Sequence, residues 1–89
     1  MRDEDFDLPV TIATEQTGQF LTVTRTAQAA EFLLERWPKN QRGREYRSAL
    51  LALVDVMEQR KTVSVARKAF AAAARKAKVL VREGRADAG

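Results

Sequence analysis

ARKAFAAAARKAKVLV, residues 66–81, separates its alanines from its cations when it is wound as an α-helix. At 100° per residue, one narrow stripe collects Ala66, Phe70, Ala73 and Ala77. The other side collects the cations Arg67, Lys68, Arg75, Lys76 and Lys78. The pattern predicts a helix to about residue 78 with a small-residue packing face and a cationic outer face. Residues 79–81, VLV, form either its last turn or a third strand, and their β-branched side chains favour the strand.

Upstream, residues 44–60 predict a second helix. Its apolar line consists of Tyr46, Leu50, Leu53 and Met57, with Ala49 and Val54 at the edges. The segment KTVS, residues 61–64, then makes a tight connection to the third helix. Ser64 is well placed to cap that third helix.

A first helix is predicted to start at Thr26, which can cap its N-terminus, and to stop at Pro38. Its i, i+3, i+4, i+7 spacing comes from Ala30, Leu33, Leu34 and Trp37. Phe32 lies about 200° from Ala30 on this winding. It is therefore expected to face solvent, where it would contact the preceding strands or a partner.

Two alternating segments before this helix, PVTIAT at 9–14 and QFLTVT at 19–24, predict a β-hairpin. The loop EQTG joins them, and Gly18 supplies the positive φ that such a loop needs. Two strands are marginal in water, so helices must cover one face. The expected organisation is a disordered acidic lead over residues 1–7, a single α+β domain over 8–81 and a disordered tail over 82–89. The expected core contains Trp37, Tyr46, Leu50, Leu53 and Phe70.

The composition of the chain excludes some classes of function. The chain has 89 residues with no cysteine and no histidine, so thiolate chemistry and the commonest general base are both excluded. Its net charge of +4 combines 3 cations against 7 anions in residues 1–37 with 13 against 5 in residues 38–89. There is no targeting pattern and no apolar run long enough for a membrane span, so the cytoplasm is the expected location.

Trp37-Pro38 closes a helix, Tyr46 is followed by Ala49, and the third helix carries Ala66-Arg67, Ala69-Phe70, Ala73, Ala74 and Ala77. In this order and spacing the chain resembles the small bacterial proteins grouped as domain of unknown function 982. The resemblance runs from the PVTI strand to the VLV segment, and it implies an α+β outline without an activity. That family often has a glycine between the second and third helices and a cysteine on the second. This chain has Arg60 and Lys61 near the first position and no cysteine, which argues against thiol chemistry.

Arg67 is the one charged residue within the matched pattern. A structural interpretation is an ion pair with Asp55 or Glu58 of the preceding helix, or a contact at a helix end. The functional interpretation is an anion contact. The structural one is favoured, because an arginine beside an alanine face is a common way to orient two helices.

No motif supports catalysis or metal binding. Asp3, Asp5 and Asp7 resemble the start of a calcium loop, but its sixth position is Leu8 instead of glycine and its twelfth is Thr14 instead of glutamate. The serines lack a histidine base and a nucleophile motif. No catalytic, metal or cofactor-binding residue is therefore assigned, and no small-molecule substrate is inferred.

Two functions remain. The favoured one is a small non-enzymatic protein-interaction or regulatory module, with a homodimer as one form and with Phe20 and Phe32 as interface candidates. The alternative is weak nucleic-acid binding, in which the second and third helices form a helix-turn-helix. The phosphate contacts would then come from Arg67, Lys68, Arg75, Lys76 and Lys78.

Overall fold

The computed structural model describes residues 3–14 and 18–84. Its elements, in chain order, are β1 (Asp5–Ala13), β2 (Phe20–Arg25), α1 (Thr26–Glu35), the single 3₁₀ turn η1 (Lys39–Gln41), α2 (Arg44–Met57), α3 (Val63–Lys76) and β3 (Leu80–Glu83). The predicted α+β class, with an N-terminal hairpin, three helices and a short last strand, is confirmed. Gly18 has the expected positive φ of 79°.

The three strands form one antiparallel sheet in the order β2-β1-β3. In one row Val10 stands between Val23 and Glu83, and in the next Thr11 stands between Thr22 and Arg82. Successive side chains of a strand point to opposite faces. The first row therefore faces the helices, and the threonine row faces away from them.

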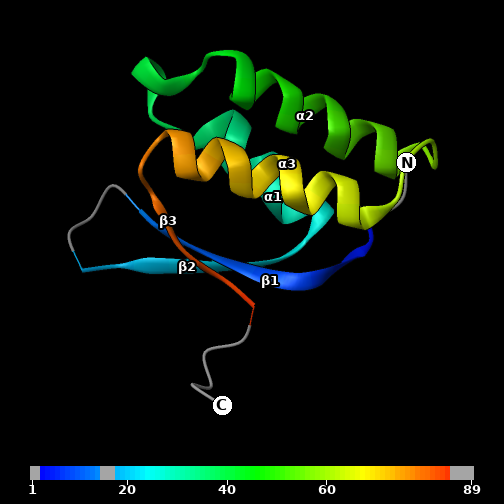
Figure 1. The fold of residues 1–89 in the computed structure, drawn as a ribbon, viewed down its shortest axis with the longest axis horizontal. Coiled ribbons are helices and arrows are strands. Elements are labelled where there is room, and N and C mark those ends of the chain that lie inside the picture. The colour runs from blue at the N-terminus through cyan, green and yellow to red at the C-terminus, as the bar shows by residue number, and fades with distance from the viewer. Residues whose placement is uncertain (1–2, 15–17, 85–89) are drawn as a thin grey trace.

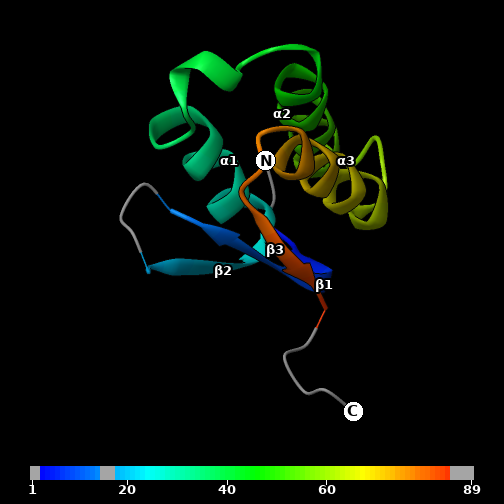
Figure 2. The ribbon, with the colours of Figure 1, turned by 60° about the vertical axis from the view of Figure 1, so that its left-hand side comes forward.

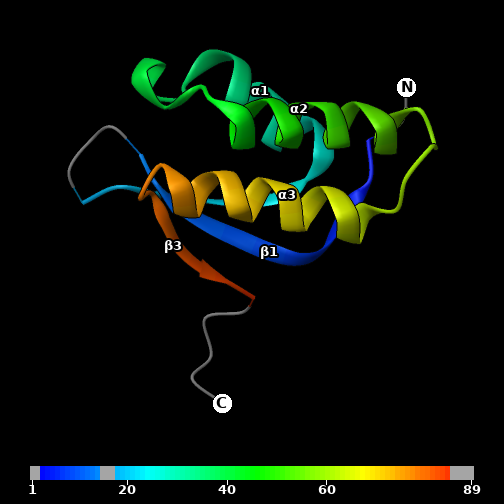
Figure 3. The same cartoon turned by 45° about the horizontal axis from the view of Figure 1, so that its top comes forward.

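The helices cover one face of the sheet (Figures 1 and 2). α1 packs over β2, and α3 packs over β1 and β3. α2 packs on α1 and α3, and Figure 3 shows it on the far side of α3 from the sheet. α2 and α3 lie side by side and run in opposite directions in Figures 1 and 3. They form an αα-hairpin, which differs from the steep crossing of a helix-turn-helix.

Aromatic rings join the layers. Phe70 of α3 lies 6.2 Å from Phe6 of β1 and 6.1 Å from Trp37 between ring centroids. Trp37 also contacts Phe32 edge-on at 5.8 Å and lies 6.2 Å from Tyr46. The two polar ring groups are satisfied, since the Trp37 indole N–H donates to the Gln41 carbonyl and the Tyr46 hydroxyl donates to the Leu33 carbonyl. The predicted core is confirmed for Trp37, Tyr46, Leu53 and Phe70, whereas Leu50 is half-buried.

The orientation predicted for α1 is wrong. Phe32 is only 4% exposed, and Leu34, assigned to the core, is 55% exposed. The reason is that α1 contacts β2, α2 and α3 together, so its buried side centres on Ala29. An interface role for Phe32 at the surface is withdrawn accordingly.

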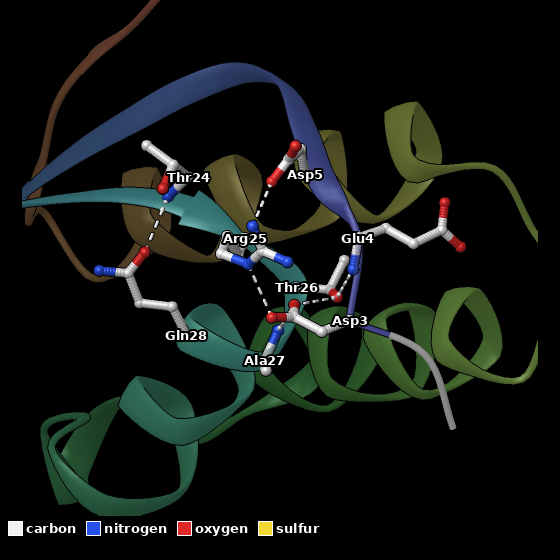
Figure 4. Close-up of polar contacts among 8 residues, drawn as sticks. All are labelled: Asp3, Glu4, Asp5, Thr24, Arg25, Thr26, Ala27 and Gln28. Atoms are coloured by element: carbon white, nitrogen blue, oxygen red, sulfur yellow. Dashed lines mark hydrogen bonds and ion pairs between the residues drawn. The ribbon is translucent and has the colours of Figure 1, made fainter.

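Aspartates of the N-terminal segment are ordered by contacts across the chain, so a disordered lead is wrong for residues 3–7. β1 already begins at Asp5. The Asp3 carboxylate accepts from the Thr26 hydroxyl at 3.1 Å and from the Ala27 backbone N–H at 2.9 Å (Figure 4). Arg25 stands at the N-cap of α1 without a side-chain cap bond, and the Thr26 hydroxyl accepts from the Glu4 backbone N–H at 2.9 Å. The helix start is therefore capped by Asp3 rather than by Thr26. Residues 1–2 lie outside the described part of the chain.

The predicted helix ends need correction. α3 begins at Val63, so Ser64 is inside the first turn and Thr62 stands at the N-cap. α2 and α3 end at Met57 and Lys76, before the left-handed residues Gln59 and Lys78.

The strand option for the C-terminal segment is confirmed by β3, so a disordered tail is wrong for residues 82 and 83. Residues 85–89 lie outside the described ranges. The predicted packing stripe is buried at Ala66, Phe70 and Ala73 of α3, and Ala77, just after the helix, is half-buried.

Candidate functional site

Arg67 lies beneath the cationic surface, at the junction of α3 with the sheet. It is 9% exposed. Its Nε and Nη2 donate to the two carboxylate oxygens of Asp7, each at 3.2 Å, and its Nη1 donates to Glu83 Oε1 at 2.6 Å. Arg75 reaches the other Glu83 oxygen at 3.2 Å. One guanidinium thus ties α3 to both β1 and β3.

The electrostatics follow from this geometry. Hydrogen bonds from Arg67 lower the pKa of Asp7, although partial burial of the carboxyl opposes them. Hydrogen bonding to Asp7 and then to Glu83 raises the pKa of Arg67. Asp7 and Arg67 are therefore both held in their charged forms.

The structural interpretation of Arg67 as an ion-pairing residue is confirmed, but its predicted partners are wrong. Asp55 and Glu58 pair instead with Arg60, at 3.2 and 2.7 Å, and Asp55 also pairs with Lys61 at 3.4 Å. In the fold, Arg67 lies on the side of α3 that meets the sheet. Its carboxylates come from strands that are distant in sequence.

The other predicted cations remain at the surface. Lys68, Arg75 and Lys76 are exposed along α3, and Lys78 is exposed just beyond it. Arg82 of β3 adds an exposed cation that sequence analysis missed. Only the strand pairing reveals the position of Arg82. It places Arg82 opposite Thr11, on the face of the sheet turned away from the helices.

The two edges of the sheet differ. On β2, the Gln28 side chain of α1 accepts from the Thr24 backbone N–H at 2.9 Å and donates to the Thr22 carbonyl at 3.3 Å. Figure 4 shows Gln28 reaching Thr24 from the helix. The amide occupies backbone groups that a neighbouring strand would otherwise use. In the described part of the chain, the side-chain hydrogen bonds of β3 involve only the Glu83 carboxylate, so its edge carries no such cover.

A shallow hollow of about 480 Å³ lies on the open face of the sheet. Its lining consists of Phe6, Pro9, Thr11, Thr22, Thr24, Arg82 and Gly84. The Thr11 and Thr22 hydroxyls are 3.2 Å apart and hydrogen-bonded. Hydroxyls beside one guanidinium suit carboxylate or carbonyl oxygens of a partner.

Phe20, the second predicted interface residue, is 63% exposed at the start of β2. Within residues 3–14 and 18–84, no group of three or more carboxylates is arranged to hold a metal ion. None of the helices in these ranges is both long and apolar enough to cross a membrane.

The fold and its Arg67 cluster define a small α+β domain with a three-stranded sheet that is helix-covered on one face. The family model of a protein of unknown function, DUF982, matches residues 8–81, and the chain belongs to this family. No curated protein and no solved structure matches the chain. Arg67 lies inside the matched range, whereas its partners Asp7 and Glu83 lie just outside it.

Proposed function

We propose that this chain is a non-enzymatic protein-interaction module of the cytoplasm that takes an extended, acidic segment of a partner protein along β3. The observation that carries the proposal is the difference between the sheet edges. Gln28 occupies the edge of β2, while β3 has no comparable cover among the described residues. An uncovered edge strand is a template for an added strand.

The register supports this choice of edge. The Gly84 backbone N–H donates to the Pro9 carbonyl at 2.7 Å and so points toward β1. Because peptide groups alternate along a strand, the N–H of Glu83 points away from β1. The main chain of a partner would pair with β3 there.

The charge of the surroundings favours an acidic segment. Lys78 precedes β3, Arg82 projects from it, and Arg75 lies beside Glu83. The Glu83 carboxylate is already bound by Arg67 and Arg75. Cations therefore dominate the solvent side of this edge, and they would attract a negatively charged strand.

The test is an NMR titration of the ¹⁵N-labelled protein with a short peptide of alternating glutamate and valine. We expect the largest amide shifts at residues 80–83, with much smaller shifts at Phe20–Arg25. The same peptide with N-methylated valines should bind at least about tenfold more weakly, because it cannot complete the ladder. Arg82→Glu should weaken binding, and Lys39→Glu, an exposed cation of η1, is the matched control. Strand addition would be refuted if the amide shifts depended only on the net charge of the protein, so that Arg82→Glu and Lys39→Glu reduced them equally.

Nucleic-acid binding is the second candidate, because Lys68, Arg75 and Lys76 are exposed along α3. Arg67 is not available for it, since its guanidinium is engaged by two carboxylates. The test is fluorescence anisotropy of labelled duplex and single-stranded nucleic acid at low salt and at about 200 mM salt. Binding that survives the higher salt and is lost on joint replacement of Lys68 and Lys76 would support this function, whereas no binding at low salt would exclude it.

A further inference from the structure

The exposed face of α2 carries opposite charges at equal sequence distances on either side of one leucine. Leu51 is 65% exposed at its centre. Arginines stand four and seven residues before it, and carboxylates stand four and seven residues after it: Arg47, Arg44, Asp55 and Glu58. At 100° per residue, these five side chains fall within an arc of about 80°. From the N-terminus to the C-terminus of α2, this face is therefore first basic, then apolar and then acidic.

The signs of these charges oppose the helix dipole. Arg44 and Arg47 lie near the N-terminus of α2, where the dipole favours anions. Asp55 and Glu58 lie near its C-terminus, where the dipole favours cations. The interaction of these four charges with the helix dipole does not stabilise α2. Their arrangement therefore suits contact with another chain.

The face is free to meet that partner. α2 packs against α1 and α3 and forms the layer farthest from the sheet in Figures 1 and 3. Across residues 3–14 and 18–84, neither Arg44 nor Arg47 has an ion-pair partner. Asp55 and Glu58 pair with the exposed cations Arg60 and Lys61; Glu58 is itself exposed, whereas Asp55 is half-buried. Ion pairs with exposed cations contribute little, so a second copy can compete for these carboxylates.

We propose that this face binds the same face of a second copy of the chain, with the two α2 helices antiparallel and the two Leu51 side chains meeting at the two-fold axis. Antiparallel pairing about residue 51 brings residue 51−k opposite residue 51+k of the partner. Arg47 then faces Asp55 of the second copy, and Arg44 faces Glu58. The antiparallel helix dipoles also attract one another.

This surface is separate from the β3 edge, so the inference stands or falls independently of the proposed function. A single pair of helices buries a small interface with one apolar contact at its centre. The dimer is therefore weak, with a dissociation constant on the order of 100 µM. It forms at high local concentration.

The test is sedimentation equilibrium of two complementary variants, Arg44→Glu/Arg47→Glu and Asp55→Lys/Glu58→Lys. The first presents an all-acidic face and the second an all-basic one. We expect each alone to self-associate at least about tenfold more weakly than the unaltered chain. An equimolar mixture should recover association to within about threefold of it or better, as a heterodimer.

Leu51→Lys should remove association, and Lys39→Glu/Lys78→Glu, a charge-matched change off this face, should leave it intact. Circular dichroism confirms that each variant is folded. A chain that stays monomeric up to about 1 mM would overturn the proposal. So would a dimer that persists in Leu51→Lys, or complementary variants that fail to associate when mixed.

Discussion

The edges of the sheet are held in different ways. β2 is followed directly by α1, and a side chain only four to six residues away, Gln28, closes its free edge. β3 is held by Arg67, which lies 16 residues before Glu83 and 60 residues after Asp7. The comparison teaches that one edge is protected by local sequence. The other depends on a long-range charged contact, and no side chain of the described residues covers its outer backbone groups.

The largest effect should come from Phe70→Ala, which removes the ring that packs between Phe6 of β1 and Trp37. Phe70 is fully buried between Phe6 and Trp37, so we expect unfolding to become easier by about 3–5 kcal/mol. Hydrogen exchange should accelerate on β2 and β3 alike. A loss below about 1 kcal/mol in urea denaturation would mean that Phe70 is not central to the core.

Arg67→Met should separate the edges. The change leaves Asp7 and Glu83 without their shared cation, and we expect a loss of about 2–4 kcal/mol. Exchange should rise at β3 before it rises at β2. Lys68→Met, the exposed neighbour on α3, is the control and should change stability by less than about 0.5 kcal/mol. Equal loss at both edges would contradict the comparison.

Acid should weaken the Asp7 contact at this junction. Because the pKa of Asp7 is lowered in the folded state by Arg67, its contribution is present above the unfolded value of about 3.9 and is lost as pH falls through the lower folded pKa. We expect about 1 kcal/mol from this half-exposed carboxyl. Urea denaturation between pH 7 and pH 2 should show a shallower acid loss in Asp7→Asn than in the unaltered chain. Parallel curves would refute the assignment.

Gln28→Ala should make the edges alike. Removing the amide frees the Thr24 N–H and the Thr22 carbonyl, with a stability loss of about 1 kcal/mol. The informative readout is association, since an uncovered β2 should pair with other chains and raise light scattering with concentration. Glu31→Gln, an exposed α1 residue, is the control. Unchanged scattering would show that Gln28 does not guard this edge.

Local patterns predicted most of the fold. Alternation gave the hairpin, and helical spacing gave α2 and the alanine face of α3. The burial of Phe32 was missed because spacing cannot tell that α1 is covered on several sides. The start of β1 at Asp5 was missed because acidic residues are uncommon in strands. Only the structure shows that Arg25 pairs with Asp5 and Arg67 with Asp7.

The candidate site was harder to predict. Helical winding separates Arg67 from the alanine stripe, but only the tertiary fold shows that its side of α3 meets the sheet. Gln28 and Arg82 carry no motif, and their roles arise from strand order and register. Lys68, Lys76 and Lys78 were correctly placed at the surface because long cations on a helix rim are rarely buried.

The ion pairs of Arg67 also bear on how the gene for such a domain should be cut for expression. A fragment trimmed to residues 8–81, the span of the family match, lacks Asp3, Asp7 and Glu83. It would leave a buried guanidinium without either carboxylate and the first helix without its cap. A fragment of this chain that begins and ends at the matched borders should therefore express poorly, whereas one that includes residues 3–84 should give a soluble product.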